Sequence, residues 1–215
     1  MRSYVITIMS MPESVKMAQR CIDSMKEYDV QMFSAITPED DPVAIANQEK
    51  IRLDHFESDA KKYSKFERCV SAFLSHYSLW KKCIEDNKEY QIFEHDALCT
   101  GNLPNFISYD RCVSIGAPSY GKFKTPMTLG TSALVSKPYF PGAHAYRLKP
   151  KGAQDLVMFA KGMAKPTDVY LNIKDFPWLQ EYYPWPVEAK DTFSTIQNEG
   201  GCRAKHNYGD GYELL

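Results

Sequence analysis

Tyr90-Gln91-Ile92-Phe93-Glu94-His95-Asp96 decides the fold, because a short strand pattern ends there in an acidic triplet. Its first four residues are mostly aromatic or apolar, which predicts a buried strand. The residues from Phe66 to Ile84, which precede this strand, carry apolar side chains at helical spacing on one broad face. A helix followed by a strand with polar residues at its carboxyl end indicates an α/β unit.

The alternation of strand and helix continues on both sides of this segment. We expect strands at residues 4–9, 30–33, 112–115, 132–135 and 145–148, and helices from Pro12 or Ser14 to Met25 and from Pro150 or Lys151 to about Gly162. Residues 38–63 are polar and predict irregular helix and loop, and residues 116–124 predict a flexible loop. The pattern predicts one α/β domain over residues 1–215, with helices on both faces of its sheet.

Composition narrows the class of protein. The chain has 215 residues, of which 44% are hydrophobic, as expected for a globular domain. No apolar run approaches the roughly 20 residues of a membrane-spanning helix. Six cysteines without a CxxC pair predict reduced core thiols in a cytoplasmic protein.

Positive charge is concentrated in one part of the chain. Residues 111–165 contain nine Lys or Arg and a single acidic residue, Asp155, although the net charge of the chain is −1. Such an excess can attract an anionic ligand, and the alternative is a solvated face balanced by its acidic neighbour.

The acidic triplet carries the clearest chemical signal. Ligands of open α/β sheets bind beyond the carboxyl ends of the strands, where Glu94 and Asp96 are expected. Hard carboxylate oxygens suit Mg²⁺ or Mn²⁺, which in turn suit a diphosphate. A solvated turn is the alternative interpretation.

Several segments in order resemble glycosyltransferase family 25. The segment Phe66-Glu67-Arg68-Cys69-Val70-Ser71-Ala72-Phe73-Leu74-Ser75-His76-Tyr77-Ser78-Leu79-Trp80 is similar to the family's E-x-G-C-x-x-S-H-x-x-x-W, and Glu94-His95-Asp96-Ala97 to its E-D-D-A. Ala145-Tyr146-Arg147-Leu148-Lys149-Pro150-Lys151-Gly152-Ala153 resembles G-Y-x-x-S-x-x-G-A, Pro166-Thr167-Asp168 resembles P-x-D, and Ser194-Thr195-Ile196 resembles a late S-x-I. The chain departs from the family at Arg68, at His95 and in lacking an Arg between Met9 and Ser14, so Lys16 or Arg20 would serve instead.

The resemblance implies a GT-A-like nucleotide-sugar-binding fold with a central, mostly parallel sheet. It also implies an inverting transferase that takes a UDP-sugar and uses Mn²⁺ or Mg²⁺. We assign Asp96, Glu94 and His144 as candidate metal ligands, and Asp168 as candidate catalytic base, with Glu94 as a second catalytic candidate. A helix N-cap is the alternative role for Asp168, and a structural histidine the alternative for His144.

Candidate donor-binding residues come from the first strand, the long helix and the loop; they are Thr7, Met9, Ser75, His76, Lys122 and Lys124. The alternative role of the first-strand residues is packing in the strand core, and that of the helix histidine is to hold a loop in place. The alternative for the two lysines is an exposed, mobile loop. The loop lysines would contact phosphates and close over the donor.

Two acceptors remain open at this point, a hydroxymethylated base in phage DNA and a core sugar of lipopolysaccharide; both are polyanionic. A catalytically inactive binding module and a metal-dependent phosphohydrolase are the rival classes. No obligate protein partner is evident.

Overall fold

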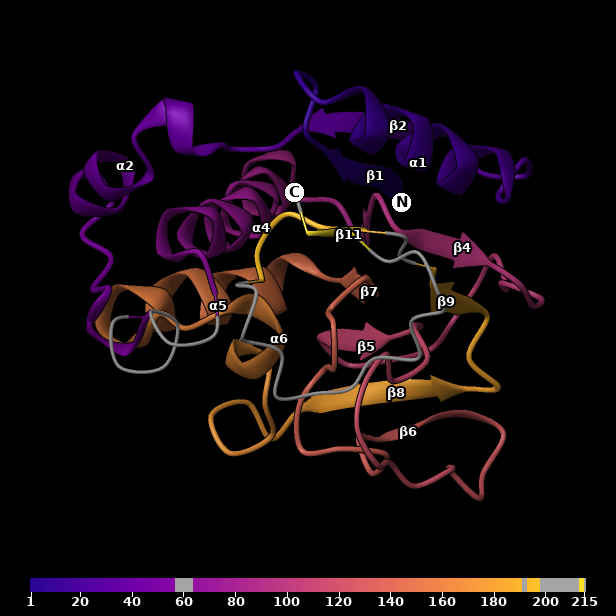
Figure 1. Ribbon diagram of the computed structural model, residues 1–215. Helices are drawn as coiled ribbons and strands as arrows, with labels where there is room; N and C mark the ends of the chain where they lie inside the picture. The colour runs from indigo at the N-terminus through magenta and orange to yellow at the C-terminus, as the bar shows by residue number, and fades with distance from the viewer. Residues whose placement is uncertain (57–63, 191–192, 198–212, 215) are drawn as a thin grey trace.

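The computed structural model describes residues 1–56, 64–190, 193–197 and 213–214. Its centre is a seven-stranded sheet, whose strands lie one above another in Figure 1. In spatial order they are β2 (Val30–Ser34), β1 (Arg2–Thr7), β3 (Tyr90–Glu94), β7 (Ala145–Leu148), β5 (Cys112–Ser114), β8 (Leu179–Tyr183) and β6 (Gly130–Ala133).

Most strands of this sheet run in one direction. β1 is parallel to both β2 and β3, and β8 is parallel to β5. β7 is antiparallel to β3 and to β5, so β3 and β5 share a direction, and β6 is antiparallel to β8. β2, β1, β3, β5 and β8 therefore point one way and only β7 and β6 the other, which confirms the expected mostly parallel sheet.

Helices cover both faces of the sheet, as predicted. Because side chains alternate along a strand, Val5 and Phe93 face α1 (Pro12–Asp23), whereas Tyr4 and Ile92 face the opposite core. That second core contains α4 (Phe66–Asp86) and α5 (Pro150–Met163), which pack against each other. Each fully buried large apolar side chain stabilises the fold by about 1.5–3 kcal/mol.

Shorter elements complete the fold (Figure 1). The 3₁₀ helix η1 (Pro38–Asp40) and α2 (Pro42–Gln48) fall in the part predicted to be irregular, and α6 (Thr167–Tyr170) follows α5. Two small sheets pair β4 (Ala97–Cys99) with β9 (Val187–Ala189) and β10 (Phe193–Ser194) with β11 (Glu213–Leu214).

One predicted strand is shifted along the chain. The expected strand at 132–135 is β6 at Gly130–Ala133, because the backbone leaves the sheet after Ala133. The buried carboxylate of Glu181 causes this departure, since its Oε1 accepts hydrogen bonds from the amides of Val135 (2.6 Å) and Ser136 (2.7 Å).

The five described cysteines, Cys21, Cys69, Cys83, Cys99 and Cys112, are free thiols. Burial raises the pKa of Cys21 and of Cys69 to about 12, so both stay protonated at neutral pH. Within the described ranges, no helix has the length and apolar character needed to cross a bilayer.

Candidate active site

The acidic triplet forms the tight turn that joins the central sheet to the small one. β3 ends at Glu94 and β4 begins at Ala97, so His95 and Asp96 make the connection. The turn therefore lies beyond the carboxyl end of a central strand, where α/β sheets bind their ligands.

A buried hydrogen-bonded chain holds Glu94 from the side of α4. His76 Nε2 lies 2.9 Å from Glu94 Oε1, and His76 Nδ1 lies 2.8 Å from the hydroxyl of Tyr146, which also accepts a hydrogen bond from Trp80 Nε1 at 2.8 Å. His76 is only 1% exposed.

The donors and acceptors of this chain have one consistent direction. An indole N–H can only donate, and burial raises the pKa of Tyr146 well above its ordinary value, so its hydroxyl keeps a proton to donate to His76 Nδ1. The tautomer that fits this direction carries its proton on Nε2, from where it is donated to Glu94 Oε1. His76 contacts only Oε1 of Glu94. Because His76 is fixed in the core, it also sets the orientation of the whole carboxylate.

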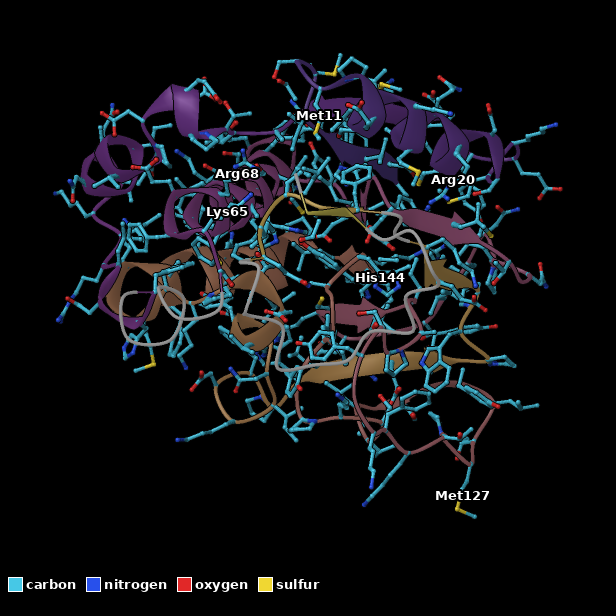
Figure 2. All side chains as sticks on the ribbon, viewed as in Figure 1. Met11, Arg20, Lys65, Arg68, Met127 and His144 are labelled. Atoms are coloured by element: carbon cyan, nitrogen blue, oxygen red, sulfur yellow. The ribbon has the colours of Figure 1, made fainter. Side chains whose placement is uncertain are left out.

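The His95 side chain and the Asp96 carbonyl both contact residues of α1. His95 Nδ1 lies 2.9 Å from Ser14 Oγ at the start of α1, and its ring lies 5.5 Å from that of Phe193. The carbonyl of Asp96 accepts hydrogen bonds from the Arg20 guanidinium (3.2 Å) and from the Lys190 amide (2.9 Å). Arg20, which lies on α1 in Figure 2, therefore contacts the turn directly, and it is one of the two residues expected to replace the family's earlier Arg.

Asp168 forms a second acidic position, in the first turn of α6. Its Oδ2 accepts a hydrogen bond from the hydroxyl of Tyr120, and its Oδ1 accepts one from the Val169 amide at 2.8 Å. Burial raises the pKa of Asp168, the hydrogen bond from Tyr120 lowers it, and the negative charge of Glu94 raises it further. The two candidate catalytic carboxylates are therefore close enough to feel each other's charge.

Lys137 helps to hold Tyr120, the residue that contacts Asp168. In the sequence alone it is only one of several basic residues. Its ammonium group donates to the carbonyl of Tyr120 and lies 4.8 Å and 5.2 Å from the ring centroids of Tyr120 and Tyr139. These are cation–π distances, and Lys137 is buried. Gly121 makes the arrangement possible, because its φ is +68° and a Cβ there would lie 2.7 Å from the lysine nitrogen. Tyr120 is thus fixed at its backbone and its ring while its hydroxyl contacts Asp168.

His144 is joined to the triplet through the backbone. The Glu94 amide donates to its carbonyl at 2.9 Å, but its buried ring packs against glycines: a Cβ at Gly116 would lie 2.5 Å from Nε2. Over the described ranges, no three His, Cys, Asp or Glu side chains form a group that could hold a metal ion. Asp96, Glu94 and His144 are therefore not gathered into a three-ligand protein cluster.

The predicted donor-binding residues divide into internal and accessible ones. The hydroxyl of Thr7 donates to the Val5 carbonyl (3.0 Å), and that of Ser75 donates to the Ser71 carbonyl (2.8 Å) while it accepts from the Ile36 amide (2.9 Å). Both are buried and shape the protein interior. The accessible side chains are those of Met9, Lys122 and Lys124.

The positive charge of residues 111–165 is dispersed in the structure. Arg147 is 1% exposed and donates to Gln91 Oε1 (2.7 Å) and to the Pro104 carbonyl (2.6 Å), and Lys137 is buried as well. Arg111 pairs with Asp155 (2.6 Å) and Lys165 with Asp175 (3.1 Å). The excess of positive charge counted in residues 111–165 of the sequence is therefore larger than the positive charge accessible to an anionic ligand.

The late segment Ser194–Ile196 runs beside the start of α4. The Lys65 amide donates to the Ile196 carbonyl at 2.6 Å, and Arg68 Nη1 donates to the Thr195 carbonyl at 3.0 Å (Figure 2). Arg68, where the family pattern has Gly, thus has a structural role in holding this segment.

Comparison with known protein families identifies the family of this chain. The model of glycosyltransferase family 25, described as an LPS biosynthesis protein, matches residues 1–171. The chain belongs to glycosyltransferase family 25. The match contains the acidic triplet, His76, His144 and Asp168, and together with the sheet it confirms the expected GT-A-like fold of this family 25 member. A search of the curated proteins found no match to the chain.

Proposed function

We propose that this family 25 member is a metal-dependent, inverting glycosyltransferase that moves a sugar from a UDP-sugar to an acceptor hydroxyl. The observation that supports the proposal is that two carboxylates are each held by a hydrogen bond: Glu94, at the carboxyl end of β3, by His76, and Asp168 by Tyr120. Such oriented carboxylates would supply a base and a polar contact for the reaction.

Glu94 and Asp96 are the residues that would hold the cation. Their hard oxygen donors fit Mn²⁺ or Mg²⁺, and a cation of this kind is commonly held by one or two carboxylates together with substrate phosphates. The lack of a three-residue group among the described residues is compatible with such a site. The bound cation would neutralise charge on the diphosphate leaving group.

Asp168 is the proposed base. The acceptor oxygen attacks the anomeric carbon, the bond from that carbon to the phosphate oxygen breaks, UDP leaves, and the acceptor proton moves to Asp168. Tyr120 and the Val169 amide fix the orientation of the carboxylate for this transfer. One displacement of this kind inverts the configuration of the anomeric carbon.

The acceptor we favour is a saccharide of lipopolysaccharide. The description of the family supports it, and the dispersal of basic side chains removes part of the reason to favour DNA. Hydroxymethylated DNA remains the second candidate, since Lys122, Phe123 and Lys124 are exposed together.

A panel of UDP-sugars with Mn²⁺, offered to truncated lipopolysaccharide or to hydroxymethylcytosine DNA, tests the proposal by mass spectrometry of each acceptor. We expect the saccharide to gain one sugar mass. Sugar mass on the DNA alone would replace the favoured acceptor with the second one. UDP binding without transfer to either acceptor would favour an inactive binding module, and phosphate release without an acceptor would favour a phosphohydrolase.

A further inference from the structure

The loop that connects β5 to β6 exposes large apolar side chains near its end. Met127 is fully exposed, Leu129 is 74% exposed and Phe123 is 46% exposed. Figure 2 shows Met127 projecting from the end of the molecule next to β6. Solvent-facing apolar side chains are ordinary when they are scattered, but these three lie within seven successive residues.

The charges of the same loop are all positive. Lys122 and Lys124 are exposed beside the apolar tip. No Asp or Glu occurs in the sequence between Asp110 and Asp155, so no acidic residue of the loop offsets them. Exposed apolar side chains flanked by lysines complement a lipid bilayer, which has a hydrocarbon core and anionic headgroups.

The loop is anchored at its base, so its tip is presented by a supported backbone. The Lys124 amide donates to the Ser136 carbonyl at 3.0 Å, and the Phe123 ring lies edge-on to Trp185 with centroids 5.6 Å apart. Trp185 in turn packs on Tyr183 at 5.0 Å and donates to Glu181 at 3.3 Å. Tyrosine and tryptophan rings of this kind are favoured at the level of lipid headgroups.

We propose that residues 121–129 dock this protein on an anionic lipid bilayer, with Met127 and Leu129 inserted and Lys122 and Lys124 on the headgroups. A nucleic acid would also attract the lysines, but bases stack on aromatic faces and gain little from two exposed aliphatic side chains. Since Tyr120 at the base of the loop contacts Asp168, docking would bring the candidate site close to the bilayer. The inference goes beyond the proposed function, because lipid binding requires no turnover.

Vesicle sedimentation tests the proposal without any sugar donor. The full chain is mixed with vesicles of phosphatidylcholine alone or with about one third phosphatidylglycerol, a level that gives a negative surface potential. We expect binding to the anionic vesicles, weakened by salt as the Debye length shortens. The double variant Lys122→Ala/Lys124→Ala should bind roughly fivefold more weakly for each lysine lost. The variant Met127→Glu/Leu129→Glu should bind at least tenfold more weakly, since it replaces inserted apolar groups with charges.

The matched control is Met158→Glu/Lys161→Ala on α5, where Met158 is 71% exposed and Lys161 is also exposed. It makes similar changes to charge and hydrophobicity on another surface and should leave binding unchanged. Circular dichroism melting curves check that each variant is folded. No binding by the wild type, equal loss in the control variant, or lysine-dependent binding to duplex DNA but not to vesicles would each overturn the proposal.

Discussion

His76 on α4 and Glu94 at the end of β3 lie 2.9 Å apart, and the histidine is buried while the carboxylate is partly accessible. The hydroxyl of Tyr146 orients the imidazole from its other nitrogen. A residue of the core therefore sets the direction of a carboxylate at the candidate site, which links packing to activity.

Tyr146→Phe tests that link. Removing the hydroxyl leaves Trp80 Nε1 and His76 Nδ1 without this partner, which should lower the free energy of unfolding by about 1–3 kcal/mol in urea titrations. We also expect a fall in kcat, with a change in the ring ¹⁵N shifts of His76 as its tautomer loses its fixed assignment.

The matched control for that change is Tyr77→Phe on α4, the helix that also carries His76; the Tyr77 hydroxyl donates to Glu49 at 3.2 Å. It should cost about 1 kcal/mol of stability and leave kcat and the His76 shifts unchanged. Equal kinetic effects in both variants would contradict a specific role for Tyr146.

Tyr120→Phe should shift the pH dependence of transfer. Burial raises the pKa of Asp168, so its carboxylate takes up a proton at a higher pH than an exposed aspartate, and activity falls as pH is lowered through that value. The hydrogen bond from Tyr120 lowers this pKa, so its loss should move the acid limb of the kcat/KM profile to higher pH. An acid limb that stays in place, or moves down, would exclude Asp168 as the group responsible.

Gly121→Ala should destabilise the support of Tyr120. The new Cβ would lie 2.7 Å from Lys137 Nζ at a positive φ, and we expect a loss of about 1–2 kcal/mol in thermal or urea unfolding. Gly162→Ala in α5 is the control, because its Cβ meets open space and should stabilise the helix by up to about 1 kcal/mol. Equal effects of the two substitutions would refute the crowding at Gly121.

Metal removal should weaken donor binding through the acidic turn. We expect a chelator to reduce the stabilisation of the wild type by UDP and Mn²⁺ in thermal shift measurements, since a ligand that binds only the folded state raises Tm. Asp96→Ala should lose most of the same shift, whereas Glu85→Gln at an exposed position of α4 should keep it. An unchanged shift in Asp96→Ala would assign the cation to other residues.

The sequence predicted those parts of the fold that local periodicity controls. The strands at Arg2–Thr7 and Tyr90–Glu94 and the helix at Phe66–Asp86 all have regular apolar spacing, and all were found near their predicted places. β8 was missed although it is a strand of the central sheet. One of its inward positions is Glu181, a buried carboxylate whose partners come from elsewhere in the chain, so its pattern reads as polar.

The candidate site was predictable only in part, for a similar reason. The acidic triplet and Asp168 stood out because of their position and their resemblance to the family motifs. The roles of Tyr120, Tyr146 and Lys137 depend on contacts between segments distant in sequence, which no local pattern encodes.

Asp168→Asn provides the most direct test of the central claim, that Asp168 accepts the proton of the acceptor hydroxyl. The measurement is the rate of sugar transfer to the identified acceptor, together with the Kd for UDP in the presence of Mn²⁺. The account predicts a rate that is lower by roughly 10²–10⁴-fold with an unchanged Kd. Transfer at the wild-type rate by the variant would contradict it.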